Sequence, residues 1–116
     1  MRHFVVIVLA GLLLAGAAQA AEIDGAWTFV FQTDAGERTL AMTLQTSGHE
    51  VSGTAPGDTA VKGTYENGEL SLDFPFYSPD ADITANLQVR GKLAEGKITG
   101  DWRFSEYAGT FAATKQ

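Results

Sequence analysis

The sequence predicts an all-β protein, an eight-stranded antiparallel up-and-down β-barrel. Three observations predict this fold. Apolar and polar residues alternate along eight stretches of the chain, which is the period of a strand with one buried face. No stretch shows the period of an amphipathic helix. The links between the stretches are short, and short links join antiparallel neighbours, because parallel strands need long crossovers.

The start of the chain is expected to lie outside the fold. A basic beginning precedes an apolar run at residues 4–14, and the segment ends in Ala18-Gln19-Ala20, a small-x-small cleavage pattern. We therefore predict a cleaved signal peptide at residues 1–20 and a single barrel domain at residues 21–116. The chain contains no cysteine. An exported protein without disulfides fits a periplasmic or secreted bacterial protein.

The first four strands are separated by turns at 34–37, 47–48 and 56–59, which are rich in Gly, Asp, Ser and Pro. Each strand places its larger apolar residues on one face. The residues with inward parity are Trp27, Phe29 and Phe31 in strand 26–33, Leu40, Met42 and Leu44 in strand 38–46, Val51 and Gly53 in strand 50–55, and Val61, Gly63 and Tyr65 in strand 60–66.

The second four strands begin after Asn67-Gly68, the strongest turn signal in the chain, because both residues accept the positive φ of a two-residue type I′ hairpin. The longest loop follows at 77–82, and Pro75 beside it indicates a strand end or a bulge. The inward residues are Leu70, Leu72, Phe74 and Phe76 in strand 69–76, Ile83, Ala85, Leu87, Val89 and Gly91 in strand 83–93, Ile98, Gly100, Trp102 and Phe104 in strand 97–104, and Tyr107, Gly109, Phe111 and Ala113 in strand 107–114.

A sheet with one apolar face must close on itself or pack on a second sheet. Closure is favoured, because an even number of strands lets the last strand lie antiparallel beside the first. A flattened β-sandwich is the alternative. An eight-stranded barrel has an interior just wide enough to be filled by side chains or to hold one small ligand.

A branched residue followed two positions later by glycine recurs in four strands, as in Val51-x-Gly53 and Val61-x-Gly63. These glycines alternate with side chains instead of opening a helix, so we interpret them as structural and not as a phosphate-binding loop. Inward glycines let a small barrel bend and make room for large rings. With 56–60 as the third link, Gly53 is expected to face Gly63, and Gly109 is expected to face Trp102.

Composition and parity exclude several classes of function. The chain has 14 acidic and 8 basic residues and a formal net charge of -6, which argues against binding to nucleic acid or to an anionic membrane. No acid or base has inward parity away from the strand ends, so we predict no catalytic residue, no metal site, no cofactor and no enzyme activity. Asp80 and Asp82 alone supply too few oxygens for a calcium loop.

The longer loops gather at one end of the predicted barrel, which is therefore the natural mouth. Its rim collects acidic residues and a single basic residue, Arg38. We predict a small apolar ligand as the partner. The alternative is that the rings cap a filled core and the protein acts as a structural or accessory protein through its surface. The candidate ligand-binding residues are Phe31, Phe76, Phe104 and Tyr107 just inside the mouth, with Tyr77 above them.

The opening Gly25-x-Trp27, followed by an eight-strand meander, resembles the calycins, the lipocalin and avidin group. In that group a basic residue near the end of the last strand covers the tryptophan. The resemblance implies a structural role for Gly25, Trp27 and Lys115, with Lys115 in a cation–π contact with the ring. The chain is shorter than most lipocalins and lacks their helix. It also resembles short exported bacterial β-barrel domains that end in Gly-Thr-Phe-x-Ala-Thr, here residues 109–114, and these imply no particular binding residues.

Overall fold

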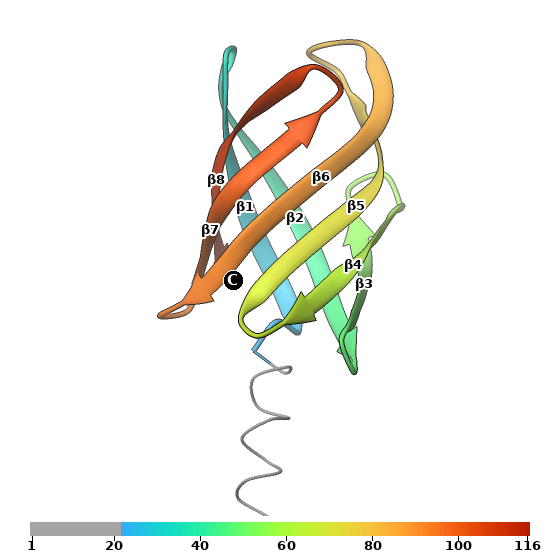
Figure 1. The fold of residues 1–116 in the computed structure, drawn as a ribbon. Helices are drawn as coiled ribbons and strands as arrows, with labels where there is room; N and C mark the ends of the chain where they lie inside the picture. Colours follow the sequence, from blue (N-terminus) through green and yellow to red (C-terminus); the bar gives the residue numbers. More distant parts are fainter. Residues whose placement is uncertain (1–21) are drawn as a thin grey trace, which may run out of the picture.

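The structure, a computed structural model, describes residues 22–116 and shows a closed barrel of eight antiparallel strands in sequence order (Figure 1). The last strand pairs antiparallel with the first and closes the barrel. The predicted fold class is therefore confirmed, and the β-sandwich alternative is wrong. The architecture is compatible with a calycin-like fold. The predicted signal peptide at residues 1–20 lies outside the described residues.

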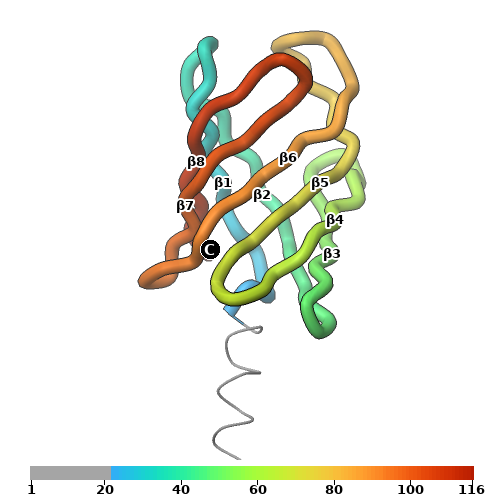
Figure 2. Tube along the Cα trace, viewed as in Figure 1, coloured from blue at the N-terminus to red at the C-terminus, as the bar shows by residue number. Residues whose placement is uncertain are grey.

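The strands agree closely with the predicted ranges. The largest differences are at the second strand, which begins two residues earlier and ends one residue later than predicted, and at the fifth strand, which continues in register past Pro75 to Ser78, so the strand end or bulge predicted at Pro75 is wrong. The chain path is clearest in Figure 2, where each strand leads directly into its neighbour. The strands are β1 (Gly25–Thr33), β2 (Gly36–Ser47), β3 (Glu50–Ala55), β4 (Thr59–Glu66), β5 (Glu69–Ser78), β6 (Ile83–Ala94), β7 (Lys97–Phe104) and β8 (Tyr107–Lys115).

The register between β3 and β4 differs from the expected one. Gly53 lies opposite Val61, and Val51 lies opposite Gly63, so the expected pairing of Gly53 with Gly63 is wrong. The reason is the turn, which contains only residues 56–58 because β4 begins at Thr59. The other expected pair, Trp102 with Gly109, is present.

Buried side chains fill the core at the end of the barrel away from the mouth, beside a surface hollow next to Glu22 and Tyr65. Trp27 is almost fully buried there, and Ile23, which precedes β1, is buried completely. The indole N–H of Trp27 donates a hydrogen bond of 2.8 Å to the carbonyl oxygen of Ile23. The segment before β1 therefore folds across the end of the barrel. Strand parity does not predict that Ile23 covers this end of the barrel, because Ile23 lies outside every strand.

Two large residues with inward parity are exposed. Ile83 is 37 % exposed and Tyr107 is 42 % exposed, so their expected inward burial is wrong. Each is the first residue of its strand, at the mouth, where the wall ends and parity no longer determines burial. Tyr107 still lines the cavity described below, whereas Ile83 does not.

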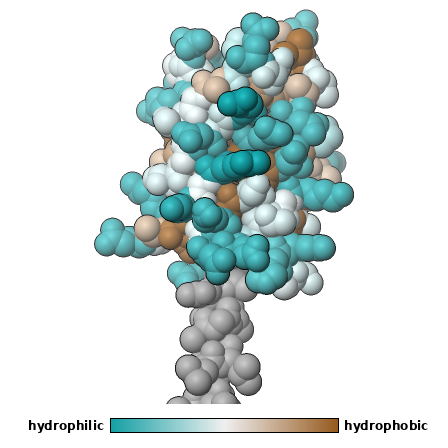
Figure 3. All heavy atoms as spheres, viewed as in Figure 1, coloured by the Kyte–Doolittle hydropathy of each residue, from teal (hydrophilic) through white to brown (hydrophobic). Residues whose placement is uncertain are grey.

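The outer face of the barrel is mostly polar. On the side shown in Figure 3, hydrophilic side chains cover the surface, with narrow hydrophobic strips between them. The alternation along each strand explains this pattern, since every second residue points outward. Within residues 22–116, no helix is long and apolar enough to cross a membrane.

Candidate functional site

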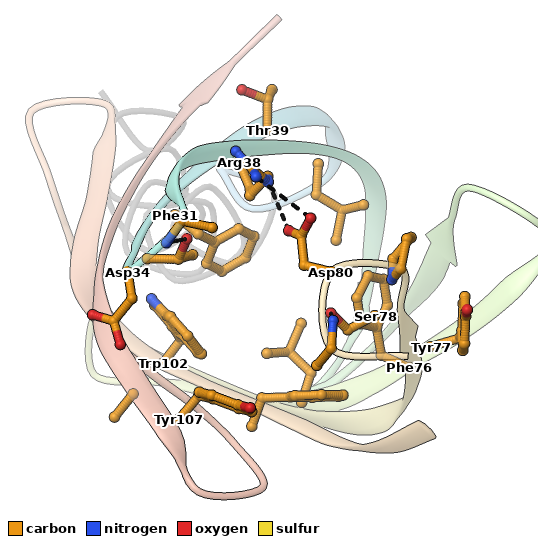
Figure 4. Close-up of a pocket in the computed structure, with 18 of the residues that line it drawn as sticks. Phe31, Asp34, Arg38, Thr39, Phe76, Tyr77, Ser78, Asp80, Trp102 and Tyr107 are labelled. Carbon is orange, nitrogen blue, oxygen red and sulfur yellow. Dashed lines mark hydrogen bonds and ion pairs between the residues drawn. The ribbon is translucent and has the colours of Figure 1, made fainter. Parts of the chain in front are cut away.

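A cavity of about 610 Å³ opens at the mouth of the barrel (Figure 4). Its walls are built from the mouth ends of β1, β2, β5, β6, β7 and β8. Inward parity near these ends brings aromatic and aliphatic side chains together around one space. The inward-facing apolar residues that line it include Phe31, Leu40, Phe76, Leu87, Trp102 and Phe104.

The rings of the cavity are held edge-on against one another. Phe31 meets Trp102 at 6.2 Å between centroids and 86° between planes. Phe76 meets Phe104 at 6.1 Å and 83°. Edge-to-face contacts of this kind are favourable for aromatic pairs, so each pair of rings supports the orientation of its members in the wall.

The structure brings all five predicted ligand-binding residues to this cavity. Phe31 and Phe104 are buried in its wall, and Phe76 is half-buried. Tyr77 is 51 % exposed and lies with Tyr107 at the rim. These five residues therefore surround one opening. Whether they bind a ligand stays a prediction.

Three further residues of the wall were not among the predicted binding residues: Leu40, Leu87 and Trp102. The sequence does predict that these residues point into the barrel. All three have inward parity, and Trp102 is two positions from Phe104 on the same face of β7. Parity alone does not place them at the mouth, because the height of a residue in a barrel depends on how far each strand is shifted against its neighbours.

Trp102 also helps to close the seam between β1 and β8. Its indole N–H donates a hydrogen bond of 3.1 Å to the carbonyl oxygen of Gln32. Gly109 makes this possible, since a Cβ there would lie 2.7 Å from the indole nitrogen and would overlap the Gln32 carbonyl. The paired residues of β1 and β8 end at Phe31 and Phe111, and the indole extends the seam beyond them.

An ion pair crosses the rim of the cavity. Arg38 at the start of β2 and Asp80 in the β5–β6 loop meet at 2.7 Å between Nε and Oδ2. The hydrogen bond from Arg38 lowers the pKa of the Asp80 carboxyl below its usual value, and the same contact raises the pKa of the guanidinium. Both side chains are about half exposed, so the pair stabilises the fold little.

The same loop holds a second polar contact. The hydroxyl of Tyr77 donates a hydrogen bond of 2.8 Å to Asp82 Oδ1. Asp80 and Asp82 thus each anchor one side chain at the rim. No group of three or more His, Asp or Glu side chains suited to hold a metal ion occurs in the described part of the chain.

The Tyr77–Asp82 contact gives a testable titration. The hydrogen bond to Asp82, with a smaller effect of burial, raises the pKa of Tyr77 above its ordinary value of about 10. Because the pKa of Tyr77 is raised in the folded state, the hydrogen bond of its neutral hydroxyl stabilises the folded protein. This stabilisation is complete below pH ~10 and is lost as the pH rises through the folded pKa of Tyr77. We expect the Asp82→Asn variant to titrate Tyr77 at lower pH than the wild type, as measured by ultraviolet difference absorbance.

The assignment of that transition requires two further variants. Tyr77→Phe should remove it from the titration curve, and Asp58→Asn, which changes an exposed acid in another turn, should leave it in place. An unchanged Tyr77 midpoint in Asp82→Asn would contradict the hydrogen bond as the cause.

Neither the protein-family models nor the curated proteins searched contain a match to this chain. The functional argument therefore depends on the geometry of the cavity. That geometry suits binding: apolar walls remove a ligand from water, and a few polar groups at the rim orient it.

Proposed function

We propose that the protein is an exported β-barrel that binds a small apolar ligand in the cavity at its mouth. The cavity itself is the observation that carries this proposal. Its volume of about 610 Å³ falls within the range of ~300–1,000 Å³ that is usual for small-molecule sites. Its walls are aromatic and aliphatic, and its polar groups are confined to the rim.

The cavity is also what favours a binding role over the accessory role. A protein that acts only through its surface needs no space among its core residues. Here the closed end of the barrel is filled by Trp27 and Ile23, whereas the mouth end leaves a space between rings. The proposal includes a calycin-like relationship, supported by the closed eight-stranded meander and by Lys115, whose Nζ lies 5.8 Å from the centroid of the Trp27 ring. It also includes export to the periplasm or beyond, supported by the signal pattern of residues 1–20.

The proposal is tested by looking for a bound molecule. We expect native mass spectrometry of the protein purified from its own host to show an added mass that is lost after extraction with organic solvent. We also expect the extracted protein to bind the neutral apolar dye Nile red and to raise its fluorescence. Absence of both the added mass and the dye signal would reject the proposed function.

A substitution in the wall should weaken dye binding. Phe76 is half-buried and contributes a ring to the apolar surface. Truncation to alanine removes most of that contact, and a loss of ~1.4 kcal/mol weakens binding about tenfold. We expect this change in the Kd of Phe76→Ala for Nile red, measured by fluorescence titration. Ile83→Ala is the matched control, since Ile83 is exposed and lies outside the cavity. If Phe76→Ala and Ile83→Ala bind Nile red with equal affinity, the dye binds outside the cavity.

A further inference from the structure

The wall of the barrel is incomplete at the mouth. β2 pairs with β3 only from Thr43 onward, so residues 36–42 of β2 have a neighbour only on the β1 side. β4 pairs with β5 only from Gly63 onward, so residues 73–78 of β5 have a neighbour only on the β6 side. The β3–β4 turn stops well short of the other connections at this end (Figures 1 and 2). A slot therefore separates the upper part of β2 from the upper part of β5.

The cavity reaches through this slot. Thr39 and Tyr77 belong to the outer face of their strands, because Leu40 and Phe76 beside them point inward. Both outer residues nevertheless line the cavity. In Figure 4, Thr39 lies beside Arg38, and Tyr77 lies on the far side of Asp80. The cavity therefore touches both faces of the wall at the place where β2 and β5 have no strand between them.

The strand edges at the slot are poorly suited to accept another strand. The amide of Leu93 donates to the carbonyl of Gly68, so even-numbered residues of β5 bond to β6 and odd-numbered ones face the slot. One of these odd residues is Pro75, which has no N–H to donate. On the other side, the carbonyl of Glu37 is taken by Arg38 Nη1 at 2.9 Å. Proline and charged side chains are the usual protection of an edge against strand addition, so the slot favours a small molecule over a peptide.

The Arg38–Asp80 ion pair spans this slot. Arg38 comes from the β2 side and Asp80 from the loop that follows β5, and no other salt bridge is found within residues 22–116. Exposed pairs of this kind are weak and break readily. We propose that ligands enter and leave the cavity through the slot between β2 and β5, and that the Arg38–Asp80 pair is the latch that closes it. This inference rests on the proposed function of the cavity as a ligand site.

A cross-link across the slot tests the route. The chain has no cysteine, so Thr39→Cys/Tyr77→Cys can be joined by a flexible bis-maleimide, and each protein is compared with itself before cross-linking. Stopped-flow fluorescence should then show that the association and dissociation rates of Nile red fall at least about tenfold. The matched control is Gln88→Cys/Arg103→Cys, two exposed and directly paired residues of β6 and β7 that lie outside the cavity, and it should change these rates little. Slowing by the control alone, or by neither cross-link, would overturn the inference.

Removing the latch tests the role of the ion pair. Arg38→Ala and Asp80→Ala should each speed Nile red dissociation about two- to fivefold, the range expected for an exposed ion pair, and high salt should give the wild type the same rate. The control Arg90→Gln removes a cation from the outer face of β6, away from the cavity, and should keep the wild-type rate. If Nile red dissociates from both Arg38→Ala and Asp80→Ala at the wild-type rate, the ion pair does not close the slot.

A measurement without any ligand separates this inference from the proposed function. Trp102 lines the cavity, whereas Trp27 is 1 % exposed at the closed end, so acrylamide reaches mainly Trp102. Cross-linking residues 39 and 77 should lower the quenching constant of tryptophan fluorescence about twofold, because the route through the wall is then blocked and only the opening at the mouth remains. If neither a bound molecule nor Nile red binding is found, the proposed function is rejected, and this quenching result alone decides whether the slot admits small molecules. Unchanged quenching would overturn the inference.

Discussion

Trp27→Ala is expected to destabilise the protein by about 3–5 kcal/mol, the usual cost of deleting a large buried ring. Trp27 is 1 % exposed and closes the end of the barrel under the segment before β1. The variant loses the packing of the indole and leaves the carbonyl of Ile23 without its hydrogen-bond donor. For a domain of this size the melting temperature should fall by more than ~12 °C. Urea and thermal unfolding followed by circular dichroism measure both quantities.

Two milder variants divide this effect into its parts. Trp27→Phe keeps a ring but removes the N–H donor, so about 1–2 kcal/mol should be lost. Lys115→Met removes the cation that lies over the ring and its exposed hydrogen bond to the carbonyl of Glu22, at a cost of about 0.5–1 kcal/mol. A Trp27→Ala variant no less stable than Trp27→Phe would contradict the central role of ring packing at the closed end.

Gly100→Ala is expected to cost about 3 kcal/mol, at the upper end of the range for overpacking. Gly100 of β7 lies directly opposite Gly91 of β6. A Cβ at position 100 would overlap the carbonyl oxygen of Arg90 and lie 2.6 Å from the Cα of Gly91. Both contacts are backbone atoms, so no change of side-chain rotamer relieves them, and the two strands must move apart.

The matched control for this substitution is the neighbouring position on the outer face. Thr99→Ala changes an exposed side chain of the same strand and should stay within about 0.5 kcal/mol of the wild type. Urea denaturation of the three proteins gives the comparison. A Gly100→Ala variant as stable as Thr99→Ala would show that β6 and β7 do not need the close approach.

Gly100 also shows that the structural role of the recurring glycines differs from the role predicted from the sequence. Their spacing predicts inward positions that make room for large rings. In the structure, a Cβ at Gly53, Gly63 or Gly100 would first meet the backbone of the neighbouring strand. Only at Gly91 and Gly109 would it meet a ring, those of Phe111 and Trp102. Close approach of strands is thus the main reason for the repeat, and it depends on register, which spacing within one strand does not contain.

Much of the candidate site follows from parity and loop length. The alternation in β1, β5 and β7 points Phe31, Phe76 and Phe104 inward, and the positions of the long loops place them at the same end. The ion pair between Arg38 and Asp80 does not follow, because its partners are 42 residues apart and meet only through the folding of the β5–β6 loop. The slot does not follow either, since strand lengths alone do not reveal where β4 separates from β5.

The sequence by itself determined the eight strands, the face that each one buries and their antiparallel order. These properties depend on the two-residue period and on short turns, which are local features of the chain. Only the tertiary structure decided that the closed end is filled while the mouth holds a cavity, and that the wall opens between β2 and β5. Those properties depend on the shift of each strand against its neighbours and on how side chains from distant strands fill the shared interior, and neither is a local property of the chain.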